Sequence, residues 1–263
     1  MVESNNAIAR YANRRDYRKA LEIFERLQQA KAENAYSFSN MINAYVQCGE
    51  VDAAVGLLHQ LRKHPKLKLD IVSCTAVLKG YSKIGDVSKS VELLKMMKDA
   101  KPQVMPNVRT LNTFLRGCIV AGAVHDAEHQ FTEITKTFKV SPDVSSWEYL
   151  VILLSHSLQT DKILPLLGRI KDDVSNLSGL GLMYICLCKA LAILGDFKKC
   201  KKNLVQARHY LDAYDAADLT SLPDCVPEGK LTVTGGKRAW KQEENESREA
   251  SLQVEYLHKL LQC

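Results

Sequence analysis

The sequence predicts an all-α solenoid, in which two-helix repeats stack into a right-handed superhelix. Variants of one phrase begin at Arg15, Gly49, Gly85, Gly122 and Gly195. Their starts lie 34, 36, 37 and 73 residues apart, and a degenerate copy from Leu158 divides the last interval. Periods of this length are typical of helix-turn-helix repeats. Gly and Pro are sparse, at 13 and 7 of 263 residues, as an all-helical chain requires.

Each repeat is expected to hold an A helix and a B helix. In the second repeat, Met41, Ile42 and Tyr45 give helix A, over about 37–47, an apolar stripe. Gly49 follows as a helix C-terminal residue suited to left-handed geometry. Helix B then presents an apolar face made of Val51, Ala54, Leu57, Leu58 and Leu61. No single repeat can bury such stripes, so the repeats must stack.

The register of the phrase sets the expected repeat boundaries. Five repeats are predicted at 1–34, 35–70, 71–107, 108–143 and 144–180. Pro106 and Pro142 disfavour helix in the preceding residue and so separate repeats. A sixth hairpin is expected at 181–218, an exposed loop at 219–240 and a C-terminal capping helix at 241–263. We expect the chain to be a piece of a longer protein.

Composition narrows the class of protein. Hydrophobic residues make up 46% and charged residues 25%, which is ordinary for a soluble protein. No apolar run approaches the roughly 18 residues of a membrane span, so no membrane partner is expected. The net charge of +6 favours a polyanionic partner. Six of the eight cysteines fall in apolar helical patterns and are predicted to be reduced core residues: Cys48, Cys74, Cys118, Cys186, Cys188 and Cys200.

Two histidines have a spacing that could form a metal site. His125 and His129 frame an H-x-x-E-H pattern that would place both imidazoles on one helical face, as zinc requires. However, Val124 and Ala127 occupy the core positions of that helix, so the histidines are expected to face outward. No downstream pattern suggests a third ligand, and we predict a solvated helix face and no metal.

Other chemical motifs are weak. Cys186 and Cys188 are two residues apart on a helix, where side chains diverge, so core packing is expected. Residues 235–238 (GGKR) lack the other residues of a phosphate-binding P-loop and are predicted to be a flexible basic loop. No Ser/His/Asp set or carboxylate pair stands out. We therefore expect no enzyme activity and no cofactor.

The repeats resemble those of the pentatricopeptide repeat (PPR) family. The resemblance is carried by IVSCTAVLKGYSKIGDVSKSVELLKMM from Ile71 and VRTLNTFLRGCIVAGAVHDAEHQFTEI from Val108. The Trp-x-x-Leu-Gly-x-x-Tyr pattern of tetratricopeptide repeats is absent. The resemblance covers about residues 1–180 with P-type-like repeats, is strong in repeats two to four, and weakens in the fifth.

This resemblance implies binding of single-stranded RNA, one base per repeat. In the family, the fifth residue of helix A and the last residue of the repeat contact the base edge. The pairs are Asn5 with Asn34, Ser39 with Asp70, Thr75 with Asn107, and Asn112 with Asp143. All are short and polar, as a base edge requires, although each alone could simply be a helix N-cap. The family's preferences imply the core 5′-pyrimidine-G-A-U-3′.

The second residue of each repeat packs against base faces in this family. The stacking positions hold Val2, Tyr36, Val72 and Arg109. Ser145 departs from that pattern, and Glu148 brings an unwelcome acid to the fifth position, so the fifth repeat is not expected to read a base. The candidate phosphate contacts are Lys83, implied by the family, and the cluster Lys198, Lys199 and Lys202. A solvated face is the alternative for that cluster.

The sequence therefore predicts a non-catalytic RNA-binding domain of a longer protein. The family implies organellar RNA processing, stability or translation, in a mitochondrion or chloroplast, with any effector domain outside this chain. The alternative is a protein-interaction scaffold that binds a peptide in the same groove, or a structural subunit of a ribonucleoprotein.

Overall fold

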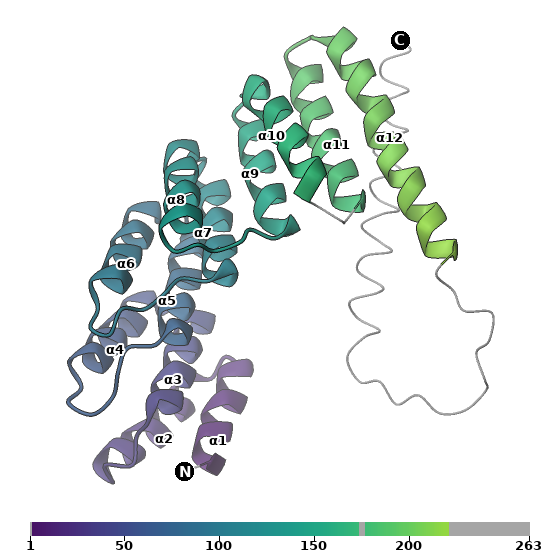
Figure 1. The fold of residues 1–263 in the computed structure, drawn as a ribbon. Coiled ribbons are helices and arrows are strands. Elements are labelled where there is room, and N and C mark those ends of the chain that lie inside the picture. The colour runs from purple at the N-terminus through teal and green to yellow at the C-terminus, as the bar shows by residue number, and fades with distance from the viewer. Residues whose placement is uncertain (1, 174–176, 221–263) are drawn as a thin grey trace, which may run out of the picture. The chain divides into compact units, whose positions relative to one another are not determined.

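The computed structural model describes residues 2–173 and 177–220, which form twelve helices and no strand (Figure 1). The helices are α1 (Val2–Asn13), α2 (Tyr17–Gln29), α3 (Ala35–Cys48), α4 (Val51–Lys63), α5 (Ile71–Ile84), α6 (Val87–Asp99), α7 (Val108–Ala121), α8 (Val124–Thr137), α9 (Val144–His156), α10 (Thr160–Asp173), α11 (Leu177–Ile193) and α12 (Phe197–Thr220). The predicted all-α class is confirmed. The chain divides into two compact units, and the division between Ser146 and Trp147 falls inside α9.

The first unit is a solenoid of stacked helix pairs. Helices α1, α3, α5 and α7 pack side by side in one layer, each against the next. Helices α2, α4 and α6 each pack against the A helix that follows them, and α8 packs against α7 (Figure 1). Helix A of the second repeat runs over Ala35–Cys48, slightly longer than the predicted 37–47.

Side-chain caps define where the A helices begin. The side chains of Asn34, Asp70 and Asn107 are N-caps of α3, α5 and α7. They accept hydrogen bonds from the backbone N–H groups of Ser37 (2.9 Å), Ser73 (2.7 Å) and Thr110 (3.0 Å), respectively. Each cap satisfies a backbone donor that the helix leaves unpaired.

Glycines end the A helices of the first unit as predicted. Gly49, Gly85 and Gly122 adopt left-handed backbone with φ of 89°, 71° and 67°. Glycine adopts this geometry without the steric cost that a Cβ imposes. In the second unit, Leu158 takes a left-handed φ of 58° just after α9, where the fifth repeat lacks the glycine.

The layers of the first unit are held by tight packing. Phe24, Phe38 and Phe114 are buried, and Phe24 meets Phe38 edge-to-face. Gly117 allows α7 to approach α5, because a Cβ at position 117 would lie 2.9 Å from Cα of Ser82. The Ser82 hydroxyl donates to the Thr113 carbonyl at 2.8 Å and links the same two helices. Interiors this close leave no room for added atoms.

The second unit differs from expectation at its hairpin. Helix α11 begins at Leu177, ahead of the expected start at residue 181, because Gly181 lies inside the helix against Leu211 of α12. Helix α12 extends to Thr220. The rest of the predicted 219–240 loop and the predicted 241–263 capping helix lie outside the described residues. Among the described helices, none combines the length and apolarity that a bilayer crossing demands.

The six described cysteines are free thiols, and four of them are buried. Burial raises the pKa of the thiols of Cys74 and Cys118 to about 12. Such thiols stay protonated and act as small apolar side chains, so the predicted core role is confirmed for these two.

Candidate nucleic-acid interface

The A helices of the first unit line a groove. Helices α3, α5 and α7 line this groove, which has a volume of about 740 Å³. Six of the predicted contact residues line it: Ser39, Val72, Thr75, Lys83, Asn107 and Arg109. The sequence-derived positions therefore meet on one surface although they come from three repeats.

The predicted base-reading residues meet in pairs across each repeat junction. The Asn112 amide nitrogen donates to both carboxylate oxygens of Asp143, at 3.0 and 3.1 Å. The Asn5 amide donates to Asn34 Oδ1 at 3.3 Å, and the Ser39 hydroxyl to Asp70 Oδ2 at 3.4 Å. The fourth pair, Thr75 and Asn107, is joined through Thr110, whose Oγ1 lies 3.2 Å from Thr75 Oγ1 and 3.2 Å from Asn107 Oδ1.

The pairs differ in how much of each side chain reaches solvent. Asn107 and Asp143 are exposed, whereas Ser39 is only 8% exposed. The other members are half-buried: Asn5, Asn34, Asp70, Thr75 and Asn112. Every pair therefore retains at least one member that a ligand in the groove can reach.

The sequence prediction missed a third residue at each junction. The third residue of the following A helix is always a hydroxyl, and it is fully buried: Ser37, Ser73, Thr110 and Ser146. Each hydroxyl contacts the fifth-position side chain of the preceding repeat, at 2.6 to 3.2 Å. The sequence does hold the signal, since every junction reads Asn/Asp-x-x-Ser/Thr, which is a variant of the capping box.

The fourth junction has the densest network. The Ser146 hydroxyl lies 2.6 Å from Asn112 Oδ1 and 2.9 Å from Asp143 Oδ1. Partial burial raises the pKa of Asp143, but the hydrogen bonds from Asn112 and Ser146 together outweigh it, so this pKa lies below its ordinary value of 3.8. Asp143 is therefore an ionised, acceptor-only group at neutral pH.

The stacking positions carry exposed apolar side chains. Val2, Tyr36 and Val72 are 74%, 75% and 63% exposed, and Arg109 at the equivalent position is also exposed. Apolar groups at one register position of successive repeats form a row beside the polar pairs. Such side chains and the Arg109 guanidinium offer flat or compact surfaces against which bases can pack.

The groove holds more positive charge than the prediction gave it. Lys79 and Arg116 are exposed and line the groove together with Lys83 and Arg109. Lys79 lies one helical turn before Lys83, and Arg116 occupies the register position of Lys79 in the next repeat. That equivalence was visible in the sequence and could have identified both residues.

The predicted lysine cluster lies in the second unit, on α12. Lys198, Lys199 and Lys202 are all exposed. The ammonium of Lys199 pairs with Asp196 at 3.0 Å, which raises its pKa. In α9, Glu148 lies close enough to Cys186 of α11 for its charge to act on that thiol, whose pKa is raised first by burial.

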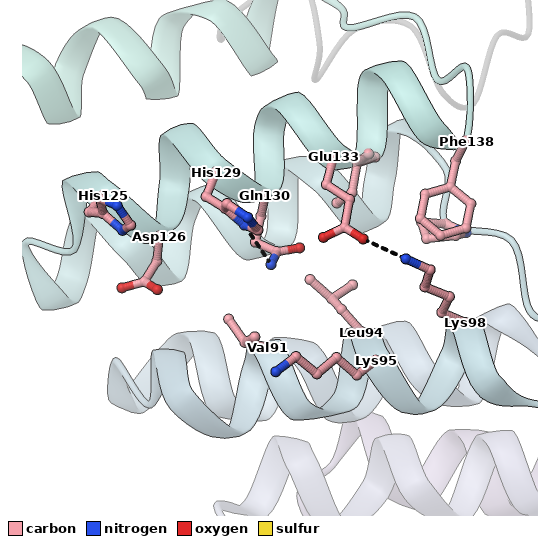
Figure 2. Close-up of a pocket in the computed structure, with 12 residues that line it drawn as sticks. Val91, Leu94, Lys95, Lys98, His125, Asp126, His129, Gln130, Glu133 and Phe138 are labelled. Carbon is pink, nitrogen blue, oxygen red and sulfur yellow. Dashed lines mark hydrogen bonds and ion pairs between the residues drawn. The ribbon is translucent and has the colours of Figure 1, made fainter.

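The two histidines of the H-x-x-E-H pattern line a separate, smaller cavity of about 360 Å³ between α6 and α8 (Figure 2). His125 and His129 are exposed on α8, as predicted. His129 Nδ1 lies 3.3 Å from the Gln130 amide, and Lys98 bridges to Glu133 at 2.9 Å (Figure 2). Among residues 2–173 and 177–220, no group of three or more His, Cys, Asp or Glu side chains is arranged to hold a metal.

The fold and its groove define a helical-repeat protein with a polar, basic A-helix surface. Family models described as PPR repeat match residues 5–31 and 36–64, and one described as PPR repeat family matches residues 69–119. These three stretches of the chain are therefore pentatricopeptide repeats.

Individual relatives agree with this assignment. The chain is 25% identical over 147 residues to the pentatricopeptide repeat-containing protein At1g77170, mitochondrial, of Arabidopsis thaliana, covering 55% of the chain and 30% of that relative. Thus the chain matches less than a third of the length of this curated relative.

Solved structures show the same fold. The pentatricopeptide repeat protein PPR10, in complex with an 18-nt psaJ RNA element, matches with a TM-score of 0.54 at 20% identity, covering 63% of this chain and 24% of that one. The PPR domain of Arabidopsis thaliana protein-only RNase P 1, in complex with tRNA, matches with a TM-score of 0.52 at 15% identity, covering 64% of this chain and 86% of that one.

Proposed function

We propose that the first unit binds single-stranded RNA along its A helices, through the α3–α5–α7 groove at their centre, with one base facing each junction pair. The observation that carries this proposal is the geometry of the pairs. Four repeats each place two short polar side chains in hydrogen-bonding proximity, directly or through a third hydroxyl, beside an exposed stacking residue. Single-stranded bases need both a polar edge partner and a packing surface.

Phosphate contacts would come from the basic side chains of the groove. Lys79, Lys83 and Arg116 lie on the same groove lining as the junction residues, where they can face the backbone of a bound strand. Lys198, Lys199 and Lys202 of the second unit are further candidates. The junction pairs, taken in chain order with the family's preferences, give the core 5′-pyrimidine-G-A-U-3′.

The biological setting of the proposal comes from relatives. A matched relative is named mitochondrial, and the two matched structures hold RNA. We place this chain in organellar RNA processing, stability or translation, in a mitochondrion or chloroplast, as a part that binds RNA and catalyses nothing itself. Any effector domain would lie outside this chain.

A binding assay tests the proposal. Fluorescence anisotropy compares an oligonucleotide carrying the predicted core with a scrambled one of equal composition. Changing Asn112→Ala together with Asp143→Ala is expected to remove the preference for the fourth base. His125→Ala with Asp126→Ala, also an exposed pair but on α8, is the matched control and should leave binding unchanged. Equal affinity of the unaltered protein for both oligonucleotides would refute the base code.

The alternative function is a scaffold that binds a peptide in the same groove. The groove contains Asn40 and Asn43 next to Lys79, and amide and amine side chains of this kind can hold a peptide backbone or carboxylate. A peptide partner would compete with RNA for the groove, and the affinity of the peptide would not depend strongly on the salt concentration. Steeply salt-dependent binding of RNA alone would favour the RNA proposal.

A further inference from the structure

We propose that the buried hydroxyl at the third position of each following A helix is a positioning residue that fixes the orientation of the base-reading side chain before it. This inference rests on the proposed RNA function. It concerns Ser37, Ser73, Thr110 and Ser146. None of them can reach a base, because all four are fully buried.

The fourth junction shows how the orientation is set. A carboxylate can only accept hydrogen bonds, so the amide side of Asn112 that faces Asp143 must be its nitrogen. The Asn112 oxygen then faces the Ser146 hydroxyl, which donates to it at 2.6 Å. Both ends of the amide are engaged. What remains for a base is the second N–H of Asn112 and the further hydrogen bonds that the carboxylate oxygens of Asp143 can accept.

The first junction repeats this arrangement with different chemistry at the last position. Ser37 donates to Asn5 Oδ1 at 2.8 Å, and the Asn5 nitrogen donates to Asn34 Oδ1 at 3.3 Å. The Asn34 amide is oriented by its own cap, because its Oδ1 accepts the Ser37 backbone N–H at 2.9 Å. Asn5 therefore turns its nitrogen toward Asn34, and the Ser37 hydroxyl holds the Asn5 oxygen on the other side.

Hydroxyl side chains replace the amide at the middle junctions. Ser39 Oγ lies 2.9 Å from Ser73 Oγ, and Thr75 Oγ1 lies 3.2 Å from Thr110 Oγ1. A hydroxyl carries one proton, so a partner that occupies one direction decides whether the reader donates or accepts toward the base. The Ser39 proton points to the Ala35 carbonyl at 2.9 Å, so Ser73 can only donate to Ser39 Oγ. The third-position hydroxyl thus contacts and holds the fifth-position side chain at all four junctions.

The same hydroxyl also caps its helix, so a simple loss of affinity would not distinguish positioning from stability. The Asp143 backbone N–H donates to Ser146 Oγ at 3.2 Å, in addition to the contacts above. The discriminating measurement is base preference at individual positions of the RNA. A loss of stability weakens the binding of every oligonucleotide. A base-reading side chain that is no longer held in one orientation weakens discrimination only at the base that it faces.

The experiment uses Ser146→Ala in the full chain and a series of oligonucleotides varied at the second or the fourth base. We expect discrimination at the fourth base to fall about three- to tenfold, the worth of one hydrogen bond, while discrimination at the second base is unchanged. Ser146→Thr should restore the preference, because Thr110 shows that the third junction accommodates a threonine at this position. Ser73→Ala should give the reciprocal pattern.

Ser90→Ala is the matched control. Ser90 is likewise buried and donates to the Asp86 carbonyl at 2.8 Å, but it lies on α6 and contacts no reader. Discrimination in Ser146→Ala that stays intact, or that falls equally at both bases or equally in Ser90→Ala, would overturn the positioning role. Failure of the unaltered protein to bind RNA with any base preference is a different outcome, which overturns the proposed function and this inference together.

Discussion

The two units use the same kind of helix pair but differ at the edges of their A helices. Up to Ser146, every A helix from α3 onward follows an Asn or Asp cap, and α3, α5 and α7 end in a left-handed glycine. From Trp147 on, Glu148 stands at the proposed base-reading position and Leu158 at the glycine position after α9, although a left-handed Gly195 still follows α11. Burial persists through both units, as Leu78 in the first and Leu187 in the second show. The apolar core of a repeat is therefore separable from the polar edge on which the proposed base recognition depends.

The largest expected effect concerns how closely the helices of each unit approach. Gly117→Ala should destabilise the first unit by about 1–3 kcal/mol, because the new Cβ meets the backbone of Ser82. Gly181→Ala in the second unit should cost less, because its Cβ meets the side chain of Leu211, which can shift. Urea unfolding followed by circular dichroism measures both.

Gly56→Ala provides the control for this pair. Gly56 lies in α4 with no atom within 4 Å of its Cβ position, so alanine should stabilise the helix by about 0.5–1 kcal/mol. Both tryptophans lie from residue 147 onward, so tryptophan fluorescence follows the second unit. Equal losses for Gly117→Ala and Gly56→Ala would contradict the close approach of α5 and α7.

The next largest expected effect compares how the basic side chains of the two units contribute to RNA affinity. Lys79→Ala with Arg116→Ala should weaken RNA binding about tenfold and lower the slope of log affinity against log salt by about 1.4, or 0.7 per phosphate contact. Lys198→Ala with Lys202→Ala should cost about twofold, since these lysines lie outside the α3–α5–α7 groove lining. Filter binding at several salt concentrations checks both. A larger loss of RNA affinity from the α12 pair would indicate that the main phosphate contacts lie in the second unit.

A smaller effect tests the missing glycine. Leu158→Gly should stabilise the second unit by about 1 kcal/mol, because it removes the strain of a side chain at positive φ. Gly122→Leu should destabilise the first unit by a similar or larger amount. Thermal unfolding monitored by both probes compares the two. Destabilisation by Leu158→Gly would mean that the packing of Leu158 outweighs its backbone strain.

The smallest effect is a pH dependence in the first unit. The folded pKa of Asp143 lies below 3.8, so its ionised form stabilises the fold above that pH and the benefit is lost as pH falls through the lowered value. The stability difference between the unaltered protein and Asp143→Asn should therefore be greatest near neutral pH and shrink below pH 3.8. Thermal unfolding from pH 6 downward, in roughly unit steps, measures it.

Asp196 in the second unit sharpens that comparison. Its pKa is lowered first by hydrogen bonding to Lys199, a cation, whereas the donors to Asp143 are neutral. Added salt should therefore weaken the contribution of Asp196 and leave that of Asp143 nearly unchanged. An equal salt response of the two aspartates would contradict this difference.

The repeat period made it possible to predict the fold and which residues share the A-helix surface. It did not predict the contacts among those residues. The spacing of the glycines fixes the register, and the register alone places Asn112 opposite Asp143. The register did not reveal that Ser146 would lie between them, because the Asn/Asp-x-x-Ser/Thr pattern that marks this hydroxyl is also that of an ordinary helix cap. Lys79 and Arg116 were missed for a simpler reason: one position of the register was assumed to carry the phosphate contact.

Gly181 shows the opposite error. The sixth hairpin was expected to start at residue 181, whereas in the structure Gly181 lies within α11, where a Cβ would meet Leu211. A local sequence signal cannot distinguish a glycine that ends a helix from one that admits a neighbour, since both follow from the missing side chain.

The N-caps of the A helices restrict how such a protein can change its target. Asn34, Asp70 and Asn107 each begin a helix and each occupy a position that we propose reads a base. A substitution that alters the preferred base also alters the strength with which the next repeat starts to fold. The residue types that can serve in recognition at this position are therefore limited to the few that cap helices well. Adaptation to a new sequence must proceed within that list, or be compensated at the fifth position, where no helix end depends on the choice.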